Sequence, residues 1–360
     1  MSDNVYRALQ EFLDRFPLGF PETESGVEIE ILKRLFTEEE AALAVRLSPF
    51  LEEVDQLAER LGLAVDALTE DLEGMVKKGL VFRVRRSGSV AYRAAPFMIG
   101  LYEYSVKRID AELAALFAEY YEAAYVDEMA ASDVPGFKVI PIEENVESAD
   151  ALLPYQMLKQ SVRAARRIAV TDCICRKEAR LLGAGCDHPV ENCLSFGAAA
   201  DYYIDSGLGR EITADEAIAI LEEADASGLV HAGANSKHLS NICNCCPCCC
   251  ASMKGITKRG YDKHRYLNSL FEACVDGAEC SGCGLCGDVC PVGAIEVGDN
   301  AGVDRDKCLG CGLCASLCPT DAIRLVLRPD REEPFERISE MGREVLKRKQ
   351  ANAEKATRSA

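Results

Sequence analysis

The chain has 360 residues, which is enough for two or three domains, each with a sizeable hydrophobic core. Its formal net charge of −18 argues against nonspecific binding to nucleic acid or to an anionic membrane surface, since both repel an acidic protein. Nineteen cysteines, without a secretory signal at the start of the chain or an apolar run that could cross a bilayer, predict a cytoplasmic protein whose thiols serve as ligands rather than as disulfides.

The first hundred residues predict helices followed by a β-hairpin. Apolar residues fall at helical spacing in three stretches and alternate in two later ones: 31–36, 54–62, 65–76, 81–84 and 90–94. Gly62 separates the second and third predicted helices, and the turn at 86–89 separates the two strands. This order of elements resembles the winged-helix family over residues 29–95, which implies a winged-helix-like domain at the start of the chain.

The charge distribution of this domain argues against DNA binding. A recognition helix needs hydrogen-bond donors that face the major groove. The outward positions of the third predicted helix are instead mostly acidic: Asp66, Thr69, Glu70, Asp71 and Glu73. The predicted wing carries four arginines, which we interpret as a solvated face or a protein-docking patch: Arg83, Arg85, Arg86 and Arg93. We therefore expect a structural or partner-binding domain.

A long helix is predicted between residues 102 and 122. Its apolar positions recur at helical spacing: Ile109, Leu113, Leu116, Phe117 and Tyr120. Pro135 and Gly136 interrupt the pattern and mark the start of the next domain.

The middle region, 135–260, is predicted to be mostly helical and rich in cysteine. A short strand at 167–171 leads into the first cysteine pair, and residues 213–216 form the capping box of a later helix. Ten cysteines lie too close together in the sequence to be ordinary core thiols: Cys173, Cys175, Cys186, Cys193, Cys243, Cys245, Cys246, Cys248, Cys249 and Cys250. We regard all ten as candidate ligands of additional metal sites.

The sequence leaves open how these ten cysteines divide into sites. In one arrangement the first four hold one iron–sulfur cluster and the run 243–250 holds a second. A site that draws on both stretches is equally compatible with the spacing. One or two additional iron–sulfur clusters are our leading hypothesis, with zinc, or thiol–disulfide exchange through pairs such as Cys245 and Cys248, as alternatives. His188 lies between two of the cysteines and is a weaker candidate ligand.

The C-terminal region contains the most informative pattern in the chain. The spacing Cys-x-x-Cys-x-x-Cys-x-x-x-Cys-Pro begins at Cys280 and is repeated 28 residues later, at Cys308. Two copies are typical of a chain that binds two cubane [4Fe-4S] clusters, with the last cysteine of each copy serving the other cluster. We therefore assign cluster I to Cys280, Cys283, Cys286 and Cys318, and cluster II to Cys290, Cys308, Cys311 and Cys314.

The residues around these cysteines support the same interpretation. Intervening glycines let the backbone turn sharply and bring N–H groups to the cluster sulfurs. Zinc sites usually take two cysteine pairs separated by a long loop, which this spacing does not provide. From residue 271 to about 327 the chain resembles the two-cluster bacterial ferredoxin family, which implies a pseudo-twofold arrangement of β-hairpins and helices. Cys274 lies outside the pattern, and we expect it to be a buried thiol.

A second resemblance covers most of the chain. The winged-helix-like start, the Cys-x-Cys-Arg element at 173–176, the run 242–250 and the C-terminal repeat together resemble 4Fe-4S-binding proteins of anaerobic bacteria. We therefore expect an α+β, multidomain protein with five parts: a winged-helix-like domain at 1–100, a linker helix at 101–134, a cysteine-rich domain at 135–260, a two-cluster ferredoxin domain at 261–328 and a charged helical tail at 329–360.

The expected function is electron transfer, either as a carrier or as a subunit of an oxidoreductase. Because the chain is acidic, we expect redox partner proteins with basic docking surfaces and no nucleic acid. The alternative is a redox-sensing winged-helix transcription regulator, which the acidic third helix disfavours. Independent enzymatic activity has little support, since the sequence shows no catalytic triad, phosphate-binding loop or dinucleotide fingerprint.

Overall fold

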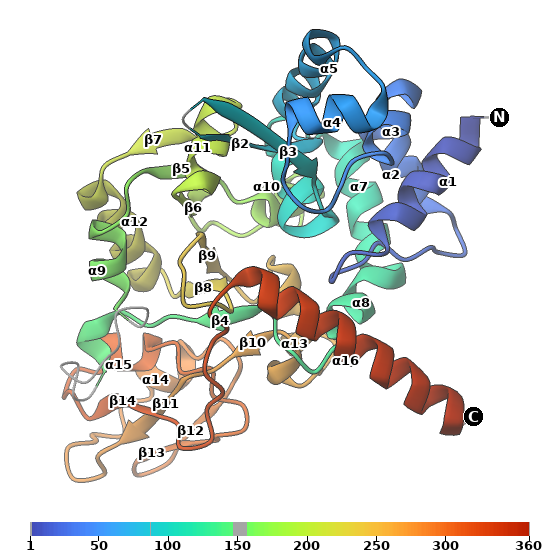
Figure 1. Ribbon diagram of the computed structural model, residues 1–360. Helices are drawn as coiled ribbons and strands as arrows, with labels where there is room; N and C mark the ends of the chain where they lie inside the picture. The colour runs from blue at the N-terminus through green and yellow to red at the C-terminus, as the bar shows by residue number, and fades with distance from the viewer. Residues whose placement is uncertain (1, 87, 147–156, 360) are drawn as a thin grey trace. The chain divides into compact units, whose positions relative to one another are not determined.

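The computed structural model describes residues 2–86, 88–146 and 157–359, and these divide into two compact units (Figure 1). The first unit comprises Met1–Met129, Thr171–Gly185 and Ala198–Arg210, and the second comprises the rest of the chain. The chain therefore passes between the units several times before residue 211. No helix of the described chain has the length and apolar character needed to cross a membrane.

The first unit begins with three helices, α1 (Ser2–Leu13), α2 (Val27–Leu35) and α3 (Glu38–Ala44). A capping box fixes the start of α3, because the Thr37 hydroxyl accepts from the Glu40 amide and the Glu40 carboxylate accepts from the Thr37 amide. The apolar pattern of the sequence does not predict α3, whose seven residues are mostly Glu and Ala.

Two helices and a three-stranded sheet follow, and the pattern of the first hundred residues predicts the helices and two of the three strands. Their bounds are β1 (Glu52–Glu53), α4 (Val54–Leu61), α5 (Val65–Lys77), β2 (Val81–Arg86) and β3 (Ser89–Ala94). The sheet is antiparallel, with the order β1-β3-β2. Gly62 ends α4 at a φ of 69°, a left-handed conformation that glycine adopts without strain. Helix α5 buries Leu68, Leu72 and Val76 and leaves Asp66, Glu70 and Asp71 exposed.

Arg83 corrects the interpretation of the wing arginines as a solvated face. Its side chain is buried and pairs with the carboxylates of Glu73 on α5 and Asp205 on α11 (Ala198–Asp205). Arg85 pairs with the same carboxylates but is exposed, and Arg93 lies over the Phe82 ring, 4.9 Å from its centroid. The side chain of Arg86 lies outside the described part of the chain.

The prediction of one long helix between residues 102 and 122 is wrong. The segment contains α6 (Tyr102–Tyr104), a 3-10 turn at Ser105–Lys107, α7 (Ala111–Tyr120), a wider π turn at Tyr121–Tyr125 and α8 (Val126–Ala130). Asp110 has an extended backbone, and its carboxylate accepts from the Leu113 amide, so a new helix begins there. An N-cap inside an apolar repeat therefore divides the helix.

The second unit contains most of a seven-stranded sheet, which the expectation of a mostly helical middle region omits. The strand order is β10-β4-β8-β9-β6-β5-β7. The strands are β4 (Phe137–Val139), β5 (Ile168–Asp172), β6 (Glu191–Phe196), β7 (Arg210–Ile212), β8 (Val230–Ala234), β9 (Asn241–Cys245) and β10 (Leu267–Asn268). Short strands separated by long helical insertions give a weak alternation signal, which explains the omission.

Helices accompany this sheet along the chain: α9 (Leu158–Arg163), α10 (Ile174–Leu181), α11, α12 (Ala214–Ala226) and α13 (Ala251–Thr257). The core of the second unit joins Val170, Leu194 and Ile242 on the strands with Leu221 on α12. Thr213 caps α12 by accepting from the Glu216 amide. The sheet thereby positions the cysteines of β9 and of the loop that follows it.

The C-terminal part of the second unit is built from two small sheets and two short helices. Strand β11 (Phe271–Val275) pairs with β14 (Ile323–Leu327), and β12 (Ile295–Val297) pairs with β13 (Ala301–Val303), both antiparallel. Helices α14 (Leu285–Asp288) and α15 (Leu313–Ser316) each carry the third cysteine of one motif. The long helix α16 (Ile338–Ser359) ends the chain, as the tail composition predicts.

Candidate iron–sulfur and metal sites

The two cysteine motifs adopt matching backbone conformations 28 residues apart. Gly282 and Gly310 have φ values of 66° and 64°, and Gly284 and Gly312 have φ values of 88° and 89°. The match extends to the residues after each Cys-Pro, where Gly293 has a φ of 60° and Asp321 a φ of 53°. Aspartate is one of the few residues with a side chain that adopts this conformation readily. The sequence repeat is therefore also a structural repeat.

Glycine is needed at Gly310 for space as well as for its dihedral angles. A Cβ atom at this position would lie 2.1 Å from the Phe271 carbonyl oxygen, and one at Gly282 would lie 2.7 Å from the Asp299 carbonyl oxygen. The loops consequently pack directly against backbone of β11 and of the β12–β13 turn. This packing fixes the cysteines that flank each glycine.

The eight cysteines line two separate cavities. One is lined by Cys290, Cys308, Cys311 and Cys314. The other is lined by Cys280, Cys283, Cys286 and Cys318. Cys290 thus belongs to the first motif but lines the cavity of the second motif. Cys318 belongs to the second motif but lines the cavity of the first motif. Apolar side chains such as Ile295, Leu313 and Leu325 complete the lining of the first cavity. Each cavity offers four cysteine sulfurs, the number that a cubane cluster requires.

The two cavities differ in burial. Cys308 and Cys314 are buried in the first cavity, whereas Cys283 in the second is exposed. Burial raises the pKa of the Cys314 thiol to about 12, with neighbouring thiols acting in the same direction. Thiols held together in this way favour a bound cation, since a metal removes the repulsion between thiolates.

Backbone N–H groups point at several of these sulfurs. The amides of Ala294, Ala301 and Gly310 lie 3.2, 3.4 and 3.4 Å from the sulfurs of Cys290, Cys280 and Cys308. For Cys318, partial burial raises the pKa, but backbone N–H groups led by that of Thr320 outweigh it and hold the pKa below its usual value. Such donors stabilise the thiolate form of cysteine. They also tune the reduction potential of a bound metal centre without being ligands themselves.

Two buried cations lie against the first cavity. Lys263 Nζ donates to the carbonyl oxygen of Cys308 at 2.6 Å, and Arg328 Nη2 donates to the same oxygen at 3.3 Å. Burial, reinforced by Arg328, lowers the pKa of Lys263 to about 8. No sequence motif marks either residue, because Lys263 precedes the repeat and Arg328 follows it.

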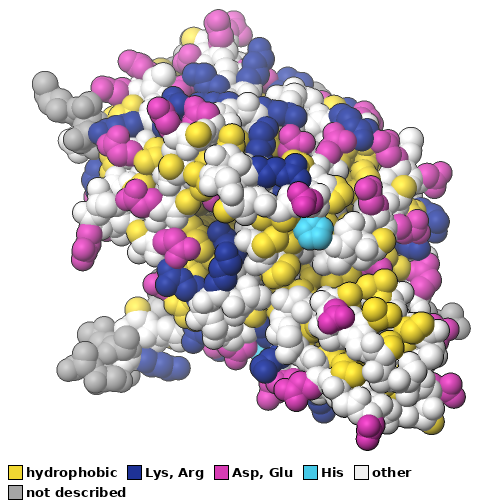
Figure 2. Space-filling model, turned by 180° about the vertical axis from the view of Figure 1, so that it is seen from behind, with side chains coloured by type: hydrophobic (Ala, Val, Ile, Leu, Met, Phe, Trp, Pro, Cys, Tyr) yellow, Lys and Arg dark blue, Asp and Glu magenta, His cyan; other side chains and the backbone are white. Residues whose placement is uncertain are grey.

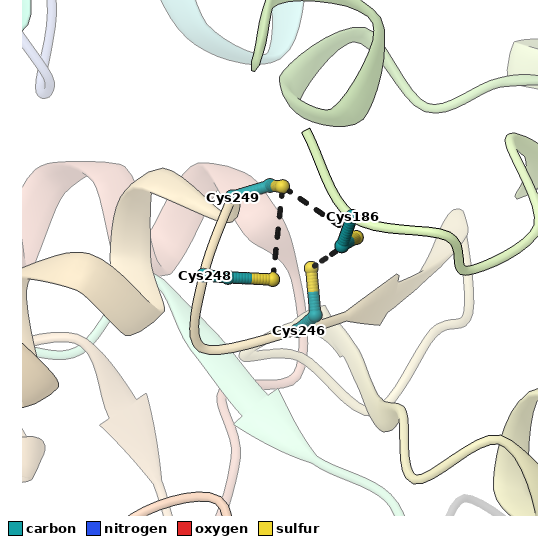
Figure 3. Close-up of side chains that lie close together, drawn as sticks. All are labelled: Cys186, Cys246, Cys248 and Cys249. Atoms are coloured by element: carbon teal, nitrogen blue, oxygen red, sulfur yellow. Dashed lines mark hydrogen bonds between the residues drawn. The ribbon is translucent and has the colours of Figure 1, made fainter. Parts of the chain in front are cut away.

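Four of the ten middle-region cysteines converge at one point (Figure 3). The sulfurs of Cys186, Cys246, Cys248 and Cys249 all lie within 4.8 Å of one another. The Sγ atom of Cys186 lies 3.9 Å from the Sγ atom of Cys246 and 3.7 Å from the Sγ atom of Cys249. The Sγ atoms of Cys248 and Cys249 are also 3.7 Å apart. Burial raises the pKa of the Cys248 thiol to about 11, with Cys246 adding to the effect. The group can hold a metal ion.

The remaining cysteines of the run 243–250 form a different group. On β9 the buried residues are Ile242 and Asn244, so Cys243 and Cys245 lie on the opposite face of the strand. The Cys245 thiol contacts those of Cys243 and Cys250. Strand β6 pairs Leu194 with Ile242, and this register places Cys193 opposite Cys243. The run thus contributes cysteines to two groups of thiols.

Cys173 and Cys175 belong to the first unit. Cys173 is the N-cap of α10, and the Cys175 thiol contacts the buried Tyr102 hydroxyl in the first unit. His188 does not belong to the converging group of described residues. Cys274 corrects a prediction, because it is exposed rather than buried. It faces outward on β11 opposite Arg324, where the strand leaves the core.

A family model described as a 4Fe-4S dicluster domain matches residues 279–322, which include both cavities. No curated protein and no solved structure matches the chain. The match covers 44 of 360 residues and therefore defines one domain rather than the whole chain. The protein is an iron–sulfur protein with a two-cluster domain in its C-terminal part.

Proposed function

We propose that the chain transfers single electrons, either as a carrier or as the electron-transfer subunit of a larger oxidoreductase. The observation that supports this most directly is the pair of four-cysteine cavities within the dicluster match. When bound, [4Fe-4S] clusters supply one-electron chemistry. The described residues around the two cavities supply cysteine thiolates, backbone N–H hydrogen-bond donors and apolar side chains that lower the local dielectric constant.

The proposed ligands follow the lining of the cavities. Cluster I takes Cys280, Cys283, Cys286 and Cys318, and cluster II takes Cys290, Cys308, Cys311 and Cys314. Each last cysteine is followed by a proline, which prevents the loop from continuing and leaves the thiol to the other site.

Paired substitutions test this exchange of ligands. The variant Cys290→Ser/Cys308→Ser removes two ligands of cluster II and is expected to lose about four irons. The matched variant Cys286→Ser/Cys290→Ser removes one ligand from each cluster and is expected to lose about eight. Equal losses in the two variants, counted as iron and acid-labile sulfide after anaerobic purification, would contradict the assignment.

The proposed partner has a basic docking surface. Residues 271–327 contain nine Asp and Glu and three Lys and Arg, a net charge of −6. Acidic side chains are spread over the visible face of the molecule, with smaller groups of basic ones between them (Figure 2). Leu285 and Leu317, which flank cluster-binding cysteines, are 45% and 38% exposed and offer apolar contacts amid this charge. Acidic rims around apolar contacts suit transient redox docking.

The N-terminal domain is proposed to be winged-helix-like and to act in structure or partner binding rather than on DNA. Its helices α4 and α5 followed by the β2–β3 hairpin support the first part. Asp66, Glu70 and Asp71 are exposed on α5, and Arg83 is committed to internal ion pairs. An acidic face repels phosphate, so the regulator hypothesis has no observation in its favour.

Electron exchange is the direct test of the function. Anaerobically reduced protein, mixed with an oxidised basic cytochrome, should regain its visible cluster absorption while the cytochrome is reduced in stoichiometric amount. A protein that binds two clusters but exchanges electrons with neither the cytochrome nor a small-molecule oxidant would contradict the proposal.

A further inference from the structure

The four converging cysteines of the middle region differ in geometry from the eight in the dicluster domain. Three pairs of their sulfurs lie in direct contact, at separations between 3.7 and 3.9 Å. Cys248 also contacts Cys246 and Cys186, so the four thiols form a compact group. Among the described residues, no three of the dicluster cysteines lie within 4.8 Å of one another, and they surround cavities instead.

This spacing matches a single tetrahedral ion. With a zinc–sulfur bond of about 2.3 Å, the sulfurs of a regular tetrahedron lie about 3.8 Å apart. A cubane cluster places four irons between its cysteines, so the sulfurs must be farther apart and leave a cavity. A disulfide needs sulfurs about 2.05 Å apart, and the sulfurs of these four cysteines lie nearly twice as far apart, so they do not form disulfides with one another.

We propose that Cys186, Cys246, Cys248 and Cys249 bind one divalent metal ion, zinc or ferrous iron, in a closed tetrathiolate site.

The local chain supports this choice. Cys246 and Cys249 have the Cys-x-x-Cys spacing common in zinc sites, and they are 1% and 3% exposed. The turn at 247–249 brings Cys248 to the same point. Four protein thiolates leave no open position for water or substrate, which is the mark of a structural site. The ion would tie the segment around Cys186 to the loop after β9, sixty residues later in the chain.

Cys248→Ser tests the proposal in the full-length protein. Cys248 is exposed, so its substitution leaves the core packing unchanged. We expect the anaerobically purified variant to contain one metal ion fewer than the wild type, with acid-labile sulfide unchanged. Cys249→Ser should give the same loss, and Cys274→Ser, an exposed thiol outside every group, should retain both metal and sulfide.

Spectroscopy distinguishes the two ions. Zinc should show X-ray absorption fine structure from four sulfurs at about 2.3 Å. Iron should show a mononuclear tetrathiolate spectrum that Cys248→Ser abolishes. Either result supports the proposal.

Loss of about four irons together with four sulfides in Cys248→Ser would identify a cluster and overturn the proposal. Unchanged metal content in both cysteine variants would also overturn it. Because sulfide reports only the clusters, failure of this proposal and failure of the electron-transfer proposal give different results.

Discussion

Gly310 shows how closely the backbone packs around the proposed cluster II. Its positive φ and the 2.1 Å approach of a Cβ atom to the Phe271 carbonyl leave no room for a side chain. We expect Gly310→Ala to displace Cys308 and Cys311 and to lower the iron content by about four per chain. In the control Gly298→Ala, where a Cβ would meet nothing within 4 Å, iron should be unchanged. Full iron content in Gly310→Ala would show that the loop tolerates the shift.

Lys263 is expected to raise the reduction potential of cluster II. A reduced cluster is more negative than an oxidised one, so a buried cation against the Cys308 carbonyl favours the reduced form. Lys263→Met should lower that potential by on the order of 50 mV, since about 59 mV is a tenfold change in a one-electron equilibrium. Cluster I should change less.

The control for this prediction is Lys307→Gln. Lys307 adjoins Cys308 in sequence, but its side chain is 59% exposed and pairs with Asp304. Its removal should shift the potential by only a few millivolts, because solvent screens an exposed charge. Equal shifts in the two variants, in titrations at pH 7, would rule out the role of burial.

The spacing of cysteines and glycines was sufficient to predict the cysteine-rich loops, because local chain geometry determines both. The roles of Lys263 and Arg328, the exposure of Cys274 and the burial of Arg83 depend on contacts between distant segments. No local pattern carries that information. The division of the ten middle cysteines likewise depends on the β6–β9 register, which brings distant residues together.

At the scale of elements, α5 and β2 are joined by a buried charge. Arg83 lies between the carboxylates of Glu73 and Asp205. Its replacement leaves two partly buried carboxylates with the exposed Arg85 as their remaining cationic partner, and Arg83→Gln should reduce the free energy of unfolding of this domain by about 3 kcal/mol. The exposed Arg85 pairs with the same groups, and Arg85→Gln should cost under about 1 kcal/mol. Thermal unfolding followed by circular dichroism compares them, and similar melting temperatures would contradict this role for Arg83.

Several elements were predicted and others were not, for identifiable reasons. The hairpin β2–β3 and the helices α4 and α5 have strong periodic patterns. The break before α7 depends on one hydrogen bond from the Leu113 amide to Asp110, which outweighs an otherwise continuous apolar stripe. The seven-stranded sheet joins strands of two to six residues, too short for alternation to be recognised.

At the scale of the whole molecule, the charge of −18 should govern association with redox partners. The second-order rate of electron exchange with a basic cytochrome is expected to fall at least tenfold between low ionic strength and about 0.5 M salt, because screening shortens the range of attraction. Stopped-flow absorbance measures this rate, and an uncharged small-molecule oxidant serves as the control. A rate independent of salt with the cytochrome would exclude electrostatic docking.

The dicluster domain is proposed to carry two one-electron centres. A redox titration of the anaerobic full-length protein, followed by electron paramagnetic resonance with counted spins, tests it most directly. We predict two reversible one-electron steps and two spins per chain at full reduction, with each spin broadened by its neighbour. A single spin per chain, or signals that do not return on reoxidation, would show that the domain does not carry two reversible one-electron centres.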